Sequence, residues 1–577
     1  MTEQRNLILA IVLSVGIILA FQYFYEIPRL HKAQQAEPGE RAAQVEKPEA
    51  DRPEAARPAP ALTSEAIETR LIEQALREAP RLAIDNARLS GSLTLRGARI
   101  DDLLLDDYRE TIDPDSARIR LLHPVGTARA YFAEFGWVAK DEGVEVPDAK
   151  TVWKVEGGPL RPGSEVVLSW DNGSGLRFEK RITLDENYMF TVRERVVNRS
   201  DRAVTLYPYG VVSRRGTPKT LGYYILHEGP IGALGERLQE IDYADLRDEG
   251  PVELESVGGW LGFTDKYWLV ALVPEQKEHI TATFRHFTND GVDRYQTDYI
   301  GAPVTVAPGD EATATAHLFA GAKEVELLDH YEETLGIPLF DRAVDFGWFY
   351  FLTKPIFYIL HTLYKWTGNY GVAILLMTLL VRLALFPLAN KSYRAMSRMK
   401  QLQPEMAKIR ERFEHDKARM NQELMELYKR EKVNPMAGCL PIVVQIPVFF
   451  ALYKVLFVNI EMRHAYFFGW IRDLSAPDPT TVFNLFGLLP WEPPAFLHIG
   501  ALPLLMGLTM WLQQRLNPQP ADPAQARVMM MLPVIFTFLF ARFPAGLVLY
   551  WAWSNLLSIA QQWVIMRQVQ KQPAKAG

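Results

Sequence analysis

Two patterns of apolar residues divide the chain. Up to about residue 335, short runs alternate apolar and polar positions between Gly, Asn and Asp, as in "SEVVLSW" and "AVTLYPYGVVS". Period-two alternation between turn residues is typical of antiparallel β structure. The length of this pattern predicts one large all-β sandwich, at residues 65–335, rather than a small module.

Long apolar runs replace this alternation in the C-terminal part of the chain, and one more lies at the N-terminus. A bilayer is crossed by about 20 apolar residues. Six stretches meet this criterion: Leu7 to Tyr25, Tyr370 to Ala389, Met436 to Val458, Phe496 to Trp511, Val528 to Phe543 and Leu547 to Met566. A further piece, "TVFNLFGLLPW" from Thr481 to Trp491, is too short to span and is predicted as an interfacial or re-entrant segment.

The segments around the sandwich have their own compositions. Residues 1–26 could be a signal peptide, but no small-residue cleavage site follows in "FYEIPRL", so a retained membrane anchor is favoured. Residues 27–64 are rich in Pro, Ala and Glu and predict a flexible tether. Residues 336–368 are rich in Trp, Tyr and Phe, which favours an amphipathic helix at the membrane interface.

The net charge of -6 is mild for 577 residues and argues neither for nor against binding of nucleic acid. We predict no DNA among the partners, and the informative feature is how the charges are distributed along the chain. Residues 391–433 carry 12 Lys and Arg, whereas residues 459–495 carry only Arg463 and Arg472. The positive-inside rule places the first loop in the cytoplasm. Counting spans from there predicts an inner-membrane protein with both termini cytoplasmic, residues 26–345 periplasmic and a basic cytoplasmic tail at 568–577.

The basic loop at 391–433 has an apolar seam of its own. Steps of three and four residues predict two antiparallel helices, with Pro404 as a kink or a restart. The seam consists of Met399, Leu402, Met406, Ile409, Phe413, Met420, Leu424 and Leu427. The hairpin is either a plain core with solvated charges or a docking surface for a nascent chain or ribosomal RNA. The docking residues would be Arg394, Arg398, Met399, Lys400, Met406, Arg410 and Arg412.

Arg382 is the most unusual residue of the apolar runs. It lies about 13 Å from the cytoplasmic end of its span, at 1.5 Å per residue. An unrelieved arginine at such a depth costs about 3 kcal/mol by insertion scales. None of the six spans contains Asp or Glu that could pair with it. The guanidinium either snorkels and fixes the depth of the helix, or it lies in a hydrated cavity that attracts an anionic guest.

Polar residues in the same and other spans could line such a cavity. The candidates are Thr378, Gln445, Asn555, Ser558 and Gln562. The last three follow at i, i+3 and i+7 and therefore share one face of a helix. The alternative is that the amides join helices to one another by hydrogen bonds.

The chain also lacks the motifs of other function classes. It has no phosphate-binding loop, no metal-ligand cluster in the spans and no obvious inverted repeat of the transporter kind. Cys439 is the only cysteine, which excludes an internal disulfide and a cysteine-built zinc site. We predict no cofactor, no metal and no enzymatic activity, and a folding and docking role for the sandwich in preference to an enzyme or sugar-binding role.

Several segments resemble one known family. "VRLALFPL", "LQPEMAKIRERF", "LYKREKVNPMAGCLPIVVQIPVFFALY", "MMLPVIFTFLFARFPAGLVLYWAWSNLLSIAQQ" and "GWLGFTDKYWLVALVP" are similar to the Gram-negative YidC-type membrane protein insertases of the YidC/Oxa/Alb family. The resemblance implies a five-helix core at 369–567 around a hydrophilic groove, with Arg382 as its charge, Thr378 and Gln445 as groove residues, and Tyr550 and Trp551 in contact with the incoming helix. It also implies a galactose-mutarotase-like supersandwich that has lost its enzymatic activity.

The expected partners follow from the same resemblance. They are nascent membrane proteins, the Sec translocon with its accessory subunits, the ribosome, the signal recognition pathway and membrane lipids. The expected protein is thus a polytopic α-helical membrane protein with six spans, a large periplasmic all-β supersandwich and a cytoplasmic helical hairpin. It would act as an insertase; the alternatives are a transporter or lipid scramblase using the same charged cavity, and a periplasmic scaffold for which the helices are only an anchor.

Overall fold

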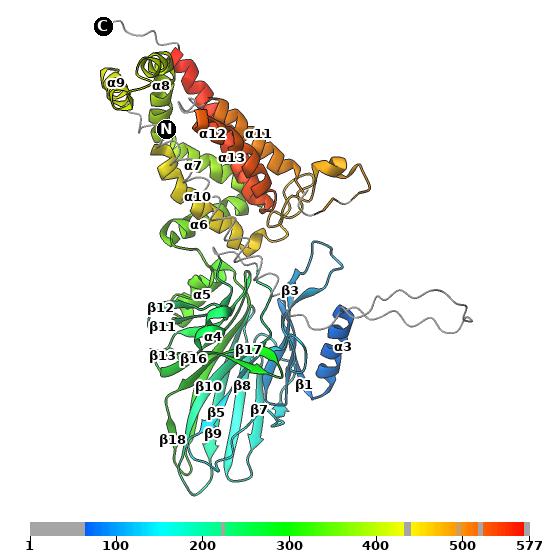
Figure 1. The fold of residues 1–577 in the computed structure, drawn as a ribbon. Helices are drawn as coiled ribbons and strands as arrows, with labels where there is room; N and C mark the ends of the chain where they lie inside the picture. The colour runs from blue at the N-terminus through cyan, green and yellow to red at the C-terminus, as the bar shows by residue number, and fades with distance from the viewer. Residues whose placement is uncertain are drawn as a thin grey trace, which may run out of the picture. The chain divides into compact units, whose positions relative to one another are not determined.

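The computed structural model describes residues 64–570 except 221–225, 432–439, 492, 495–497 and 517–522. The predicted anchor, nearly all of the tether and most of the basic tail lie outside the described residues, as does Cys439. The described chain contains a β domain, whose strands lie within residues 81–322, and a helical domain, residues 350–570, with further helices before and between them (Figure 1).

The β domain consists of two antiparallel sheets. The 10-stranded sheet has the order β1 (Arg81–Asp85), β2 (Leu89–Thr94), β3 (Arg99–Arg109), β5 (Tyr131–Ala139), β10 (Val204–Arg215), β17 (Val292–Gly301), β16 (His279–Asn289) and β13 (Val252–Val257), with β4 (Arg118–Leu122) beside β3 and β18 (Val304–Val306) beside β10. The 9-stranded sheet has the order β12 (Arg237–Glu240), β11 (Gly229–Leu234), β14 (Trp260–Thr264), β15 (Trp268–Val273), β19 (Glu311–Ala322), β9 (Met189–Asn198), β8 (Leu176–Leu184), β7 (Glu165–Asp171) and β6 (Lys154–Glu156).

Alternation of side chains explains why these segments pair as sheets. In β8, Phe178 and Ile182 are 1% and 2% exposed, whereas the neighbouring Arg181 is half-buried. Successive side chains of a strand point to opposite faces, so one face of each sheet joins the common core. Trp260, Tyr295 and Phe319 are among the largest fully buried side chains of that core. The structure confirms the prediction of antiparallel β structure.

Three helices lie inside the segment that we predicted as entirely β. They are α3 (Ser64–Arg77), α4 (Tyr243–Glu249) and α5 (Val325–Leu335). In α5 the apolar residues Val325, Leu328 and Tyr331 recur every three residues and are all buried. This helical period, rather than alternation, places α5 against the sandwich.

A short 3-10 helix, η2 (Phe340–Ala343), precedes the helical domain. The domain itself contains the helices α6 (Tyr350–Thr367), α7 (Tyr370–Ala384), α8 (Phe386–Arg412), α9 (Lys417–Arg430), α10 (Leu440–Val458), α11 (Ala501–Leu516), α12 (Pro523–Phe540) and α13 (Ala545–Gln570). Two 3-10 helices, η4 (Ile460–Met462) and η5 (Val482–Gly487), lie between α10 and α11. Helix α13 packs against α7, α8, α10 and α11 (Figure 1). It therefore lies at the centre of the helical domain.

The predicted second span, Tyr370 to Ala389, is not one straight helix. Helices α7 and α8 meet at Leu385 with a bend of 64°. Pro387 explains the break, because in an unbroken helix its ring would clash with the carbonyl of Leu383 four residues earlier. At Pro404 we predicted a kink or a restart; α8 continues through this residue, so the helix does not restart there, and the kink stays a prediction.

Length and apolar composition identify few bilayer-spanning helices in the described part of the chain. No single helix there is both long and apolar enough, and the bent pair of Tyr370–Ala384 with Phe386–Met399 meets the criterion together. The segments Gln445–Val458 and Ala526–Phe540 are apolar but shorter. The six spans therefore stay a prediction.

Helix α6 occupies the segment that we predicted as an interfacial helix. Ile356, Phe357 and Leu360 are buried on one face. Phe351 and Trp366 are 75% and 79% exposed. One apolar face of the helix is thus packed against the protein, and further large apolar side chains are exposed. Its position at a membrane surface stays a prediction.

Candidate functional site

Arg382 lies in the last turn of α7 and contacts α13. Its Nη2 donates to the hydroxyl of Ser554 at 2.6 Å and to the carbonyl oxygen of the same residue at 3.2 Å. No carboxylate of the described residues lies within ion-pair distance of this guanidinium. The two Ser554 oxygens satisfy part of its hydrogen-bonding capacity, and no acid in the described part of the chain compensates its positive charge.

Ser554 was not among the predicted site residues. The sequence contains a signal for it, because Ser554 follows Tyr550 by four residues and precedes Ser558 by four, so all three share one face of α13. Ser558 Oγ donates to the Ser554 carbonyl at 2.9 Å, and this oxygen thus accepts from both Ser558 and Arg382. Ser554 is the residue that joins the predicted charge to the predicted polar stripe.

Gln445 and Tyr550 form a second contact one turn away on α13. Gln445 Nε2, on α10, donates to the Tyr550 hydroxyl at 3.3 Å. Tyr550 is 3% exposed and Gln445 is half-buried. Since Tyr550 and Ser554 are four residues apart on α13, the Gln445 and Arg382 contacts occupy consecutive turns of one helix. Side chains from α7, α10 and α13 therefore meet here.

The remaining predicted groove residues are tied to protein atoms. Thr378, which is 1% exposed, donates to the carbonyl of Ile374 in its own helix at 2.6 Å. Asn555 Nδ2 donates to Thr509 Oγ1 of α11 at 3.3 Å. Gln562 is buried. The polar stripe thus divides, because Ser558 contacts the Ser554 carbonyl on the Arg382 side and Asn555 joins α13 to α11.

Trp551 lies in an aromatic cluster next to these contacts. Its ring centroid is 4.8 Å from that of Phe449, 5.9 Å from that of Phe536 and 4.6 Å from that of Phe540. These rings come from α10 and α12. Trp551 is half-buried, so part of its surface stays open to a neighbouring molecule.

Helices α8 and α9 form an antiparallel pair in the predicted hairpin segment. Met406 packs with Leu424 and Leu427, and the Tyr428 hydroxyl lies 3.8 Å from the sulfur of Met406. Asp416 caps α9 by accepting from the Arg419 N–H at 3.1 Å. Among the predicted docking residues, Arg394, Arg398 and Arg412 are exposed, Met399 and Arg410 are half-buried, and the side chain of Lys400 is outside the described ones. The seam residue Met406 is therefore core, and the arginines surround it.

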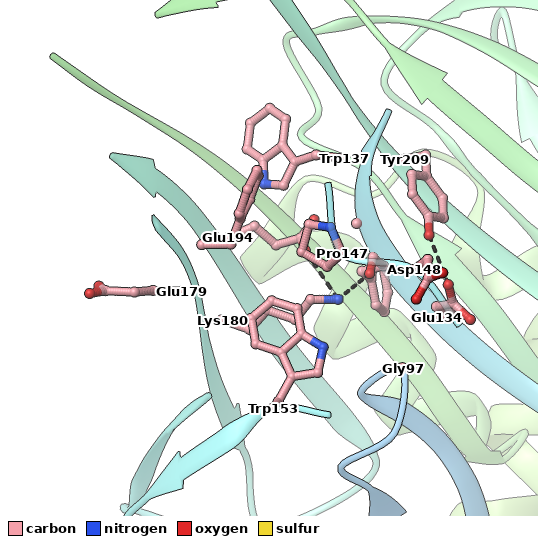
Figure 2. Close-up of a pocket in the computed structure, with 13 residues that line it drawn as sticks. Gly97, Glu134, Trp137, Pro147, Asp148, Trp153, Glu179, Lys180, Glu194 and Tyr209 are labelled. Carbon is pink, nitrogen blue, oxygen red and sulfur yellow. Dashed lines mark hydrogen bonds and ion pairs between the residues drawn. The ribbon is translucent and has the colours of Figure 1, made fainter. Parts of the chain in front are cut away.

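The β domain encloses a small cavity around Lys180 (Figure 2). Its volume is about 10 Å³, which suits one water molecule. Lys180 Nζ lies 3.3 Å from Glu194 Oε1, donates to the carbonyl of Phe135 and lies 5.1 Å from the ring centroid of Trp153. Burial raises the pKa of Glu194. The cavity is too small for a sugar, and its ion pair is a structural element of the sandwich.

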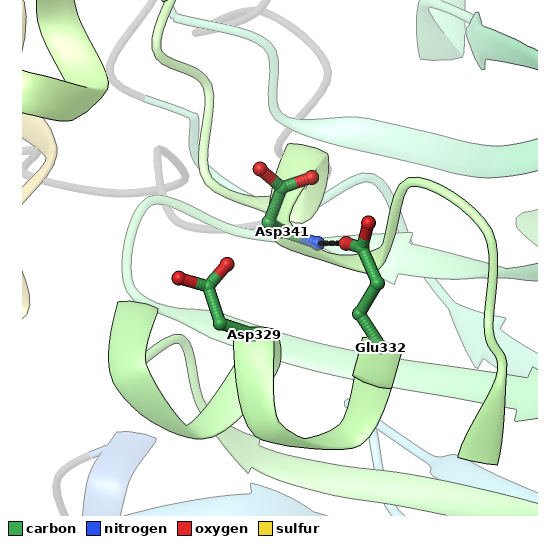
Figure 3. A group of neighbouring side chains, drawn as sticks. All are labelled: Asp329, Glu332 and Asp341. Carbon is green, nitrogen blue, oxygen red and sulfur yellow. Dashed lines mark hydrogen bonds between the residues drawn. The ribbon is translucent and has the colours of Figure 1, made fainter. Parts of the chain in front are cut away.

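Three carboxylates gather between α5 and η2 (Figure 3). The ligand atoms of Asp329, Glu332 and Asp341 lie within 4.8 Å of one another. The ammonium of Lys354, from α6, lies 2.8 Å from Asp329 Oδ1 and 2.6 Å from Asp341 Oδ2. Because this ammonium already supplies the positive charge between them, the cluster ties α6 to α5.

Comparison with known proteins identifies two family models that together cover most of the chain. Residues 81–359 match the model described as YidC periplasmic domain, and residues 362–572 match the model described as 60Kd inner membrane protein. The chain is 52% identical over 576 residues to the membrane protein insertase YidC of Sinorhizobium medicae, covering 98% of this chain and 96% of that protein. It is 49% identical over 596 residues to the protein of the same name from Bradyrhizobium diazoefficiens, covering 98% and 97%.

Solved structures give weaker likenesses. A crystal structure titled as an active YidC insertase with its first transmembrane domain resolved is 18% identical, with a TM-score of 0.35, covering 84% of this chain and 92% of that one. A galactose mutarotase-like protein from Lactobacillus casei is 12% identical, with a TM-score of 0.28, covering 42% of this chain and 100% of that one. The family assignment rests on the sequence matches.

Proposed function

The chain belongs to the YidC family of membrane protein insertases, and we propose that it inserts and folds inner-membrane proteins through a hydrated groove whose positive charge is Arg382. Members of this family are inner-membrane proteins with a periplasmic domain, and they act as insertases rather than as enzymes in the catalytic sense. The groove, its residues and cooperation with the Sec translocon are the parts that we add as proposals.

The hydrogen bonds of Arg382 carry this proposal. Ser554 holds the guanidinium at 2.6 Å and 3.2 Å through neutral oxygens, so the contact orients the charge without cancelling it. In a medium of low dielectric constant, a cation with no paired anion exerts a long-range attraction on a carboxylate. An arginine whose charge was compensated by an acid would lack this attraction. The absence of a carboxylate beside it, among the described residues, is therefore the feature that suits an anionic guest.

Insertion can proceed in two linked steps. A short acidic or polar segment of the substrate enters the groove and is drawn toward Arg382, and the adjoining apolar helix then leaves for lipid. Partitioning of a 20-residue apolar helix supplies the driving force, because its backbone hydrogen bonds are internal. The groove lowers the barrier for the polar segment. Gln445, Tyr550 and Trp551 would contact the substrate.

The other domains would recruit partners. With both termini in the cytoplasm, the pair of α8 and α9 would face the ribosome and the signal recognition pathway, where its exposed arginines can contact RNA or a nascent chain. The β domain would lie in the periplasm and serve folding and docking, including contact with the Sec translocon and its accessory subunits. Neither role requires a nucleotide or a metal.

A charge series at Arg382 tests the proposal. The variants R382K, R382A and R382E are expressed in a strain depleted of the wild-type protein, and insertion of a single-spanning substrate with a short acidic external tail is measured by protease protection. We expect R382K to support insertion, R382A to reduce it at least tenfold, and R382E to abolish it; tenfold corresponds to about 1.4 kcal/mol.

The matched control is the same substrate with its tail acids replaced by the corresponding amides. Its insertion should depend much less on the charge at position 382. Equal loss for the acidic and the neutral tail would mean that Arg382 supports the fold of the helices and does not attract the substrate. Crosslinks from Gln445 or Tyr550 to the nascent helix would distinguish an insertase from a carrier of small anions.

A further inference from the structure

The segment between α10 and α11 exposes a group of large apolar side chains that the proposed groove does not use. We name residues 481–491 the apolar tip. The exposed fractions are 40% for Phe483, 52% for Leu485, 51% for Phe486, 81% for Leu488 and 46% for Leu489. Residues 481–491 contain no ionisable side chain. Figure 1 draws this segment as a loop that extends away from the helices just before α11.

The backbone of the apolar tip is held in a strained conformation. Leu485 and Phe486 have φ values of 53° and 59°, in the left-handed region that bulky residues avoid. Two hydrogen bonds close the turn: Phe486 N donates to the Thr481 carbonyl at 2.9 Å, and Leu489 N donates to the Asn484 carbonyl at 3.0 Å. Strain of this kind persists where the surrounding structure fixes it, so the exposed conformation of the turn is a defined one.

A buried polar base fixes the apolar tip to α11. Asp478 is 5% exposed and accepts from the Leu502 N–H at 2.8 Å and from the Thr480 hydroxyl at 2.7 Å. The Thr480 hydroxyl accepts from the Ala501 N–H at 3.0 Å. Asp478 and Thr480 thus cap the first turn of α11, and a Cβ at Gly500 would collide with the Asp478 carboxylate. The base is polar and satisfied, whereas the tip is apolar and uncovered.

The exposed face of α11 continues the same apolar surface. Leu505, Leu508 and Leu512 recur at helical spacing and are 43%, 60% and 42% exposed. In an inner-membrane protein, such a face borders lipid. In water, an uncovered apolar surface of this extent promotes association. Because the tip is anchored at the first turn of this helix, lipid is the partner that suits both.

We propose that the apolar tip inserts into the bilayer at the boundary between acyl chains and headgroups, with Trp491 near the headgroups. With the topology proposed above, the leaflet is the periplasmic one. The segment would then be a fixed lipid contact beside α11, and it would lie in the interface rather than re-enter the membrane core.

Spin-label accessibility tests this contact in the full-length protein in nanodiscs. In a C439S background, a nitroxide is attached at L488C in the tip, at P477C in the base and at E142C on the β domain; Pro477 and Glu142 are exposed. We expect the label at 488 to collide several-fold more with oxygen than with a water-soluble nickel complex. The labels at 477 and 142 should show the reverse preference.

Two outcomes would overturn the proposal. Nickel access at 488 equal to that at 142 would place the tip in water, and shielding from both reagents would place it against protein. Because the measurement reports lipid contact and not insertion, it is repeated with R382A. If the tip stays in lipid in this variant, the lipid contact holds whether or not insertion is lost. The proposed lipid contact and the proposed insertase function can therefore fail independently.

Discussion

Buried arginines of the β domain and Arg382 of the helical domain have different kinds of hydrogen-bond partner. In the β domain, Arg99 lies 2.5 Å from Glu134, and Arg214 lies 2.9 Å from Asp265. Both arginines are mostly buried, with 16% and 15% of the side chain exposed. Arg382 is also partly buried, but its described partner is the hydroxyl and carbonyl of one serine.

The two arrangements have different consequences for function. A buried arginine paired with an acid is nearly neutral as a unit, and removal of one member leaves a costly unpaired charge. Such pairs stabilise one geometry and exert little field on a distant molecule. An arginine held by neutral oxygens costs more to bury, yet its field stays available. We therefore expect the ion pairs of the β domain to stabilise its fold, and the proposed role of Arg382 is to attract an anion.

The largest expected effect comes from splitting a pair in the β domain. Lys180 and Glu194 lie 3.3 Å apart, and each side chain is 5% exposed. We expect K180M to destabilise the sandwich by about 3–5 kcal/mol, because Glu194 would be left buried without its cation. The double variant K180M/E194L should recover most of this loss. Hydrogen exchange of β8 and β9 in the full-length protein measures both.

A pair at the surface gives the matched control. Arg161 and Asp85 lie 2.7 Å apart, but their side chains are 59% and 54% exposed. The variant R161M should change stability by less than about 1 kcal/mol, since solvent screens exposed pairs. If K180M had no more effect than R161M, the ion pairs of the β domain would not have the structural role that the comparison gives them.

The next largest effect comes from giving Arg382 an acidic partner, which none of the residues described in the structure supplies. The variant S554D would place a carboxylate at the position of the hydroxyl, and S554N is its uncharged control. We expect S554D to reduce insertion of the acidic-tailed substrate about thirtyfold, or roughly 2 kcal/mol, because the cation would be neutralised. Insertion of the neutral-tailed substrate, measured in parallel, reports whether the variant still folds. Full activity of S554D toward the acidic tail would contradict the proposed role of the free charge.

A smaller effect follows from a histidine surrounded by the arginines of the β domain. Burial, followed by the nearby Arg129 and Arg120, lowers the pKa of His123 from 6.5 to about 3. Between pH 6.5 and pH 3, His123 is protonated in the unfolded chain but neutral in the folded chain. The free energy of unfolding is therefore greatest above pH 6.5 and falls as the pH drops toward 3. The loss at pH 5.5 should be about 1.4 kcal/mol.

The variant H123Q should remove this part of the pH dependence. Hydrogen exchange of β4 and β5 at pH 7.5 and pH 5.5, corrected for intrinsic exchange rates, measures it. H279Q is the control, because His279 is exposed at the start of β16. An unchanged pH dependence in H123Q would show that other groups cause it.

Sequence reasoning succeeded where local pattern determines structure. Alternation around Phe178 and Ile182 predicted a strand correctly, because burial on one face of a sheet imposes a period of two. The helix α5 was missed, since its helical period covers only three buried positions. The helix is broken next to Pro387, whereas α8 continues through Pro404. The residue type alone did not distinguish the two prolines.

The site shows the same limit more sharply. The sequence indicates that Arg382 lacks an acid in its spans, yet it cannot indicate which helix faces the guanidinium. Ser554 and Asn555 are neighbours in sequence, but a step of one residue turns a helix by about 100°. One therefore contacts α7 and the other contacts α11. Partner identity depends on helix packing, which no local pattern encodes.

The smallest predicted effect tests that division between Ser554 and Asn555. Asn555 donates to Thr509 at 3.3 Å, so we expect it to join helices and not to serve the groove. The variants N555L and T509V should each lower the stability of the helical domain by about 0.6 kcal/mol, the average for hydrogen bonds between membrane helices. The double variant should lose little more than either single one, because both remove the same bond. Unfolding in mixed SDS micelles measures stability, and insertion of the acidic-tailed substrate should stay at the wild-type level; a loss comparable to that of R382A would instead place Asn555 among the residues that the substrate contacts.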